Sequence, residues 1–202
     1  MTVLFAAFFA AASAQSVEVE RTVPTSDATF IPVAQMASGT SQFSAGGTFG
    51  WQTTARVSVA HAATDRVGVE GGLHTGFGDA GADVALWLRS PSERRFFSGM
   101  RLGASTGMFI DRGVNPDDPS WGGVDDGYGA AGVMAQVGWG KPGETTFSFN
   151  AGWEFGQVFG QDFRPQAEPV LGARWDLPVT NQSSLYLAAG TQGLGAGATI
   201  TW

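Results

Sequence analysis

Apolar and polar or small side chains alternate along most of the chain after Ser41, in segments of about ten residues. In the segment 147–155, every second residue from Phe147 to Phe155 is apolar, and the residues between them are Ser, Asn, Gly and Glu. A period of two places the two sets on opposite faces of a β-strand. Each such strand therefore has one apolar face and one polar or small face.

Similar segments recur through the chain, and together they predict about ten strands. The number of strands is expected to lie between about 8 and about 12. They cover residues 43–51, 54–62, 67–77, 82–89, 100–108, 133–139, 147–155, 171–177, 185–189 and 194–202.

The predicted connections differ in length. Those at 63–66, 90–95, 140–144 and 178–183 are short, whereas two others, 111–127 and 157–166, are much longer. If the last strand ends on the periplasmic side of a membrane, every one of these short turns is periplasmic and both long loops lie outside. This asymmetry is typical of an outer-membrane barrel, and it predicts periplasmic N and C termini.

The N-terminal region has a different pattern. Residues 3–11 are continuously apolar, and Ala12-Ser13-Ala14 matches the small-residue pattern that signal peptidase reads, so residues 1–14 are predicted to be a signal peptide. An apolar helix retained in the protein is the alternative. Residues 15–41 are mixed and polar with two prolines, which indicates a periplasmic arm that could also form a small plug or bind an envelope partner. The barrel domain is then 42–202.

Composition narrows the class of protein. Of the 202 residues, 43% are hydrophobic, only 14% are charged and 30 are glycine, which disfavours a helical bundle. The net charge of -7 gives no basis for binding nucleic acid, which requires a basic surface. With no cysteine, the chain has neither disulfides nor thiolate metal sites.

Residues 1–14 and 42–202 resemble small Gram-negative outer-membrane β-barrel proteins. The last strand shows the resemblance most clearly. The strand ends in Trp202, and Ile200, Ala198, Ala196 and Leu194 precede Trp202 at alternate positions. The resemblance implies an all-β, antiparallel, up-and-down transmembrane barrel in the cell outer membrane. It also implies that the barrel-assembly machinery reads Trp202 and Ile200, and that outer-membrane lipids and lipopolysaccharide surround the barrel.

A soluble exported barrel or sandwich is the competing interpretation, with the aromatic face as its core. Its water-facing residues would then be largely Gly, Ala and Ser, which is unlike an ordinary soluble surface. Aromatic residues also recur near strand ends, where membrane barrels place their aromatic girdles: Trp51, Trp139, Phe155, Trp175 and Trp202.

If the apolar faces meet lipid, charges of both signs face the lumen. We expect a polar lumen network of Arg56, Glu70, His74, Asp83, Arg101, Glu154, Arg174 and Asp176, with Trp87 and Arg89 on the same face. The lumen of a barrel this small is about filled by side chains, so these charges must pair. They form either a structural network that closes the lumen or a polar path for a small solute or ion.

Other candidate chemistry is sparse. His74 shares the inward face and could pair with Glu70 or Asp83, and His61 is expected at the membrane interface. An enzyme acting on lipid A or phospholipid would need a serine beside a histidine, and no pair in the sequence indicates one. The longest predicted loop contains five aspartates: Asp111, Asp117, Asp118, Asp125 and Asp126. They form either a divalent-cation site or a solvated acidic loop.

The sequence thus predicts an outer-membrane barrel with a structural, adhesive or complex-anchoring role and a mostly plugged lumen. A narrow pore and a lipid-modifying enzyme are the alternatives. No cofactor is expected.

Overall fold

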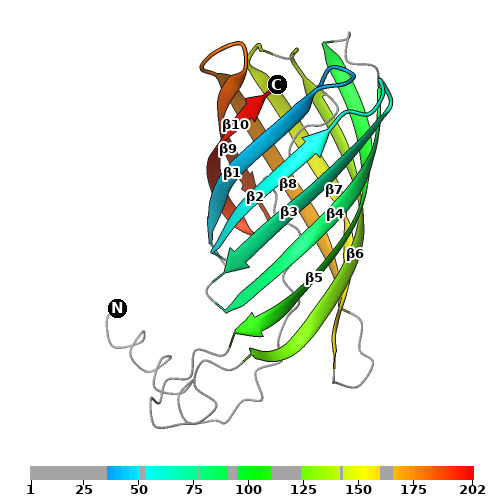
Figure 1. The fold of residues 1–202 in the computed structure, drawn as a ribbon, viewed down its shortest axis with the longest axis vertical. Coiled ribbons are helices and arrows are strands. Elements are labelled where there is room, and N and C mark those ends of the chain that lie inside the picture. Colours follow the sequence, from blue (N-terminus) through cyan, green and yellow to red (C-terminus); the bar gives the residue numbers. More distant parts are fainter. Residues whose placement is uncertain are drawn as a thin grey trace, which may run out of the picture.

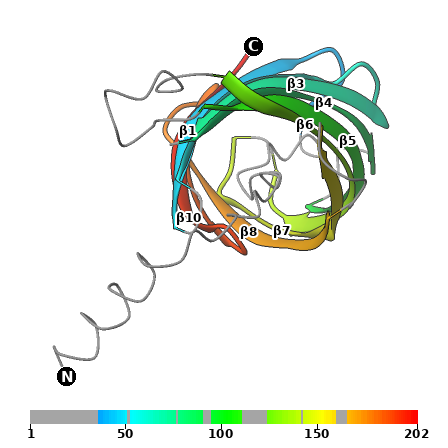
Figure 2. The ribbon, with the colours of Figure 1, turned by 90° about the horizontal axis from the view of Figure 1, so that it is seen from below.

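The chain forms one closed barrel of ten antiparallel strands (Figures 1 and 2). The structure, a computed structural model, describes residues 36–50, 53–76, 78–90, 95–110, 124–141, 143–159 and 166–202, without the side chains of 124–126. Each strand pairs with its neighbours in the sequence, and β1 pairs with β10 to close the barrel. The prediction of an all-β, up-and-down barrel of about ten strands is confirmed. Within the described ranges, no helix has the length and apolarity needed to cross a membrane.

The strands contain between 8 and 16 residues, and the longest lie on the β5–β8 side. Their bounds are β1 Ser41–Gly50, β2 Thr54–His61, β3 Val67–Gly76, β4 Asp79–Arg89, β5 Phe96–Ile110, β6 Val124–Trp139, β7 Thr146–Val158, β8 Gln166–Pro178, β9 Ser183–Gly190 and β10 Gly193–Thr201.

The two ends of the barrel differ, as the connection lengths predicted. At one end, uppermost in Figure 1, the connections 62–66, 90–95, 140–145 and 179–182 meet the start of β1 and the end of β10. We call this the short-turn end. The opposite end, which we call the loop end, has the two longest connections, 111–123 and 159–165, together with the three shortest, 51–53, 77–78 and 191–192.

The predicted bounds of the longest loop were wrong. The strand β6 begins at Val124, so Asp125 and Asp126 belong to a strand rather than to the loop. Asp and Gly are poor strand formers, and they hide the period of two in this stretch. The ladder between β5 and β6 is also irregular here, with a register shift between Met108 and Ile110 that local periodicity does not reveal.

The distribution of apolar and charged side chains in the barrel is the reverse of that in a soluble protein. Large apolar side chains point outward and are exposed, including Leu73 at 61%, Val84 at 63% and Phe149 at 54%. The opposite faces of the strands point into the lumen, where eight of the charged side chains that the structure describes are buried: Arg56, Glu70, Asp83, Arg89, Arg101, Glu154, Arg174 and Asp176. A monomer in water rarely exposes so continuous an apolar surface.

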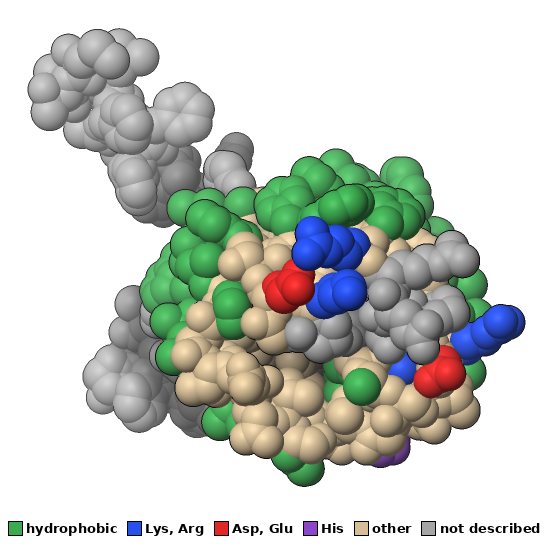
Figure 3. All heavy atoms as spheres, turned by 90° about the horizontal axis from the view of Figure 1, so that it is seen from above, with side chains coloured by type: hydrophobic (Ala, Val, Ile, Leu, Met, Phe, Trp, Pro, Cys, Tyr) green, Lys and Arg blue, Asp and Glu red, His purple; other side chains and the backbone are tan. Residues whose placement is uncertain are grey.

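Aromatic side chains gather on the outer surface near the short-turn end. Phe96, Trp139, Phe147 and Trp175 are register partners across β5, β6, β7 and β8, and all four are exposed. Trp202 at the end of the chain is also exposed. Figure 3, viewed onto this end, shows hydrophobic side chains gathered along part of the circumference, with a few charged side chains among the backbone and uncharged polar side chains.

Rings inside the lumen lie over glycines of the neighbouring strand. Gly81, Gly107, Gly138 and Gly197 are the register partners of His74, Tyr128, Phe97 and Tyr186. A Cβ atom added to any of these glycines would lie 2.2–2.6 Å from an atom of the partner ring. These four glycines therefore give the lumen rings room to lie against the wall.

Candidate functional site: the charged network of the lumen

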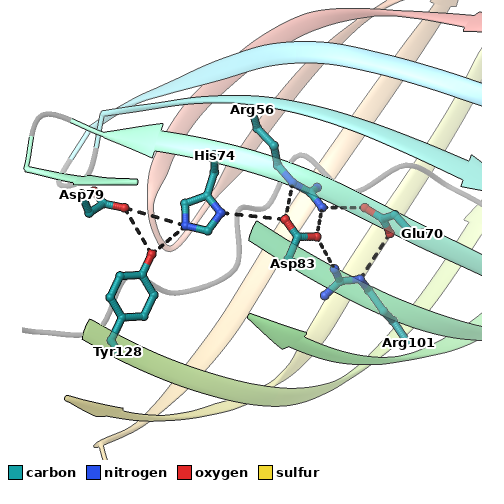
Figure 4. Close-up of polar contacts among 7 residues, drawn as sticks. All are labelled: Arg56, Glu70, His74, Asp79, Asp83, Arg101 and Tyr128. Atoms are coloured by element: carbon teal, nitrogen blue, oxygen red, sulfur yellow. Dashed lines mark hydrogen bonds and ion pairs between the residues drawn. The ribbon is translucent and has the colours of Figure 1, made fainter. Parts of the chain in front are cut away.

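Four charged side chains from four consecutive strands meet inside the barrel (Figure 4). Arg56 comes from β2, Glu70 from β3, Asp83 from β4 and Arg101 from β5. Each lies on the inward face of its strand, so the period of two brings all four to the same side of the wall. We call these four residues the charged cluster.

The ion pairs of the charged cluster share partners. The Nη2 atom of Arg56 lies 2.6 Å from Oε1 of Glu70 and 2.5 Å from Oδ2 of Asp83. Arg101 contacts the same two carboxylates, with 3.4 Å from Nε to Glu70 and 3.4 Å from Nη2 to Asp83. The indole Nε1 of Trp87 also donates to Glu70 Oε2 at 2.9 Å.

Burial makes this sharing necessary. The side chains of Arg56, Glu70, Asp83 and Arg101 have relative exposures of 7%, 0%, 9% and 4%. An unpaired charge at such burial costs several kcal/mol, at about the scale measured for broken buried ion pairs. Two guanidinium groups and two carboxylates balance one another, so the cluster as a whole carries no net charge.

A second group continues the network toward the loop end. His74 Nε2 lies 2.7 Å from the hydroxyl of Tyr128, and that hydroxyl donates to Asp79 Oδ2 at 3.4 Å. His74 Nδ1 lies 3.8 Å from Asp83 Oδ1, which connects this group to the charged cluster. Polar contacts therefore run without a gap from Asp79 to Glu70 (Figure 4).

The opposite wall of the lumen holds separate polar contacts. Arg174 donates to Asp176 on the same strand, with Nη2 2.5 Å from Oδ1, and its guanidinium lies 3.9 Å from the centre of the Tyr186 ring. On β6 and β7, Gln136 Nε2 donates to Asn150 Oδ1 at 2.9 Å. Glu154 is buried on β7.

Seven of the eight predicted network residues fall into two sets, and Glu154, buried on β7, belongs to neither. The structure brings Arg56, Glu70, His74, Asp83 and Arg101 together, and it places Arg174 and Asp176 in a pair of their own. Sequence reasoning missed Asp79, Tyr128 and the role of Trp87 as a donor to Glu70. The inward parity of Trp87 was recognised, but Tyr128 adjoined the predicted loop 111–127 and Asp79 lies where β4 begins, so neither was assigned to a face.

The acidic residues proposed for a divalent cation lie largely outside the described residues. This holds for Asp111, Asp117 and Asp118, and for the side chains of Asp125 and Asp126. Among the side chains that the structure does describe, no three His, Asp or Glu residues are grouped so that they could hold a metal ion.

A serine and a histidine meet at the short-turn end, which the sequence did not suggest. Ser41 and His61 are register partners on β1 and β2, and Ser41 Oγ lies 3.0 Å from His61 Nδ1. A hydrolytic site also needs a group that orients the histidine and donors for an oxyanion. The described contacts of His61 provide neither, so this pair has the character of an ordinary cross-strand hydrogen bond.

A cavity of about 190 Å³ opens at the short-turn end. Its lining is rich in hydroxyl and amide groups, with Asp176 as its buried carboxylate; it includes Met36, Gln42, Thr146, Ser184 and Thr199. The cavity is large enough for a few water molecules or one small solute.

Comparison with known proteins adds little to this picture. No protein-family model and no curated protein matches the sequence. Among solved structures, the translocator domain of the autotransporter NalP from Neisseria meningitidis is similar, with 10% identity, a TM-score of 0.34, and coverage of 80% of this chain and 85% of that one. A similarity at this level supports no argument about function.

Proposed function

We propose that the protein is an integral outer-membrane barrel whose ion-paired lumen is closed, and that it has a structural or complex-anchoring role. One observation carries the proposal: the large side chains exposed on the outward faces of the strands are apolar, while the buried side chains include eight charged residues. A hydrocarbon environment accounts for this arrangement, because lipid contacts the apolar surface and a closed sheet leaves no backbone group without a partner.

The orientation follows from the ends of the barrel. In outer-membrane barrels the short turns are periplasmic, which would place Ser41 and Trp202 on the periplasmic side. Trp202 and Ile200, exposed at 60% and 53%, would then present an apolar terminal strand to the barrel-assembly machinery. Outer-membrane lipids and lipopolysaccharide would surround the apolar surface.

The charged cluster favours a closed lumen over a pore. The two guanidinium groups are held by Glu70 and Asp83, so they are not available to a passing ion or solute. The cavity at the short-turn end is the one observation that favours a narrow pore as a second candidate.

Planar-bilayer recordings separate the two candidates. The purified protein, folded as judged by a heat-dependent shift in electrophoretic mobility, is expected to insert without stepwise conductance. The Arg101→Gln variant should also show no stepwise conductance, and neither should Arg95→Gln at the exposed rim. Stepwise conductance in the unsubstituted protein, altered by Arg101→Gln but not by Arg95→Gln, would support the pore and reject the closed lumen.

A further inference from the structure

The wall of the barrel differs in height around its circumference. The strands β9, β10, β1 and β2 contain 8, 9, 10 and 8 residues, whereas β5, β6 and β7 contain 15, 16 and 13. We call the first four strands the short side and the last three the tall side. The difference lies at the loop end, where β5 and β6 extend well beyond β1 and β2 (Figure 1). At a strand tilt of about 40°, each residue rises about 2.5 Å along the barrel axis, which gives about 20–25 Å for the short side and about 32–40 Å for the tall side.

The strand β8 has a free edge where the short side begins. It pairs with β7 up to its first residue, but its ladder with β9 begins only at Gly172. Just beyond that ladder, Thr191 N in the β9–β10 turn donates to Leu171 O at 2.9 Å. Alternate residues of a strand direct their backbone groups to the same side, so Ala167 and Pro169 direct theirs past the end of β9, where no described strand pairs with them. A proline has no N–H and is typical of such an edge.

Hydrocarbon is a poor environment for this free edge and for the turn beside it. Backbone N–H and C=O groups without a partner are strongly disfavoured in the core of a bilayer, so they lie in water or among lipid headgroups. The edge presents the N–H and C=O of Ala167 and the C=O of Pro169, and the turn presents the exposed Thr191. Beside β9, the hydrocarbon layer must therefore end near Thr191.

The outward apolar residues of the short side end at the same level. On β9 the outward face consists of Leu185, Leu187 and Ala189, which cover about 10 Å along the barrel axis. On β1 and β10 the last described outward residues toward the loop end are Phe49 and Leu194. They are register partners and are exposed at 71% and 67%.

The tall side carries a longer apolar surface. On β5 the outward residues run from Phe96 to Met108, with two hydroxyl residues among them, and cover about 30 Å along the barrel axis. Phe96 and Met108 are exposed at 56% and 45%. The apolar band of an outer-membrane barrel is about 25 Å tall, which the tall side reaches and the short side does not.

We propose that the short side binds a thinned bilayer, in which the leaflet at the loop end is drawn toward the β9–β10 turn, while the tall side binds a bilayer of ordinary thickness. A hydrophobic surface that is too short for its bilayer is accommodated by local thinning, at a cost well below that of burying unpaired backbone groups in hydrocarbon. The short side thus fits lipids with short acyl chains. The inference rests on the membrane-embedded barrel of the proposed function and adds the lipid environment of one side.

Leu194 and Trp153 are matched positions for a test. Leu194 on β10 lies seven residues before Thr201, and Trp153 on β7 lies seven residues after Thr146, so both are equally far from the short-turn end. Both point outward, with exposures of 67% and 52%. The chain has no native cysteine, so Leu194→Cys and Trp153→Cys can each carry a single nitroxide. Power saturation with oxygen and with a nickel complex then measures the depth of each nitroxide in vesicles of eighteen-carbon lipid.

We expect the nitroxide at position 194 to lie about 5 Å closer to the headgroups than the nitroxide at position 153, which is the difference between the ordinary apolar band and the short side. The difference should disappear in twelve-carbon lipid, because a thin bilayer already matches the short side. If Leu194→Cys does not fold, as judged by the heat-dependent mobility shift, Phe49→Cys replaces it.

Equal depths in eighteen-carbon lipid would overturn the thinned bilayer. So would a nitroxide at position 194 that is shielded from both oxygen and nickel, because a second protein chain would then cover the short side. The proposed function fails on different results, namely a nitroxide at position 153 without contact with lipid, or a protein that conducts.

Discussion

Glu70→Gln is expected to lower the free energy of unfolding of the barrel by about 3–5 kcal/mol, the scale on which removing one member of a buried ion pair destabilises a protein. Glu70 accepts from Arg56 at 2.6 Å, from Trp87 at 2.9 Å and from Arg101 at 3.4 Å. Glutamine keeps an oxygen for Trp87 but removes the negative charge. Two buried guanidinium groups would then share the single carboxylate of Asp83.

Urea unfolding in lipid vesicles or detergent micelles measures this loss. The exposed pair Arg95–Glu144, 3.9 Å apart at the short-turn end, is the matched control, and Glu144→Gln should cost less than about 1 kcal/mol. Removing a charge of each sign, as in Glu70→Leu with Arg101→Met, should recover much of the loss because the remaining Arg56 and Asp83 still balance. Equal effects of Glu70→Gln and Glu144→Gln would show that the charged cluster is not what stabilises the lumen.

Gly46→Ala is expected to destabilise the closure of the barrel by about 2–3 kcal/mol, the upper part of the range for overpacking a core. Gly46 and Gly197 are register partners across the seam between β1 and β10, and Tyr186 of β9 lies over both of them. A Cβ atom on Gly46 would lie 1.9 Å from the Tyr186 hydroxyl oxygen and 2.7 Å from the carbonyl oxygen of Ala196. One of the three strands must shift to make room.

Gly71 provides the control for this substitution. A Cβ atom there would meet its nearest neighbour, the carbonyl oxygen of Asp83, at 3.8 Å, which is ordinary contact. The melting temperature is the temperature at which the folded, heat-modifiable band disappears from the gel. Gly71→Ala should leave it almost unchanged, whereas Gly46→Ala should lower it. Tyr186→Phe removes the closest atom and should recover part of the loss in the double variant. The account of the seam is wrong if both glycine variants melt alike.

The parts of the fold that depend on local pattern were predictable. A period of two assigns each residue to one face of its strand, so the inward positions of Arg56, Glu70 and Asp83 followed without knowledge of the structure. The lengths of the predicted connections indicated that the two longest loops lie at the same end of the barrel. Both features depend on residues close in the sequence.

The partners inside the lumen were less predictable, because register and barrel closure decide them. Tyr128 and His74 are 54 residues apart, and their 2.7 Å contact depends on the pairing of every strand between them. Asp79 and Tyr128 escaped assignment because each lies near a connection, where the alternating pattern ends. The unpartnered oxygen of Gln136 could be recognised only once its neighbours were known.

The glycines illustrate the same limit. Their abundance disfavoured a helical bundle, but the sequence did not show which rings they accommodate. The structure assigns Gly197 to Tyr186 and Gly107 to Tyr128 as cross-strand partners. A glycine opposite a lumen aromatic is a pairing that only the register reveals.

Lipid quenching along β6 tests the inside-out barrel most directly. Single cysteines at each position from 130 to 137 would carry an environment-sensitive fluorophore in vesicles containing brominated lipid acyl chains. The account predicts strong quenching at the outward positions, such as Val133 and Val137, which are 41% and 43% exposed, and weak quenching at the inward positions, such as Met134 and Gln136, which are 4% and 1% exposed. Quenching that does not alternate, or that is strong at the inward positions, would contradict a barrel that turns its apolar face to lipid.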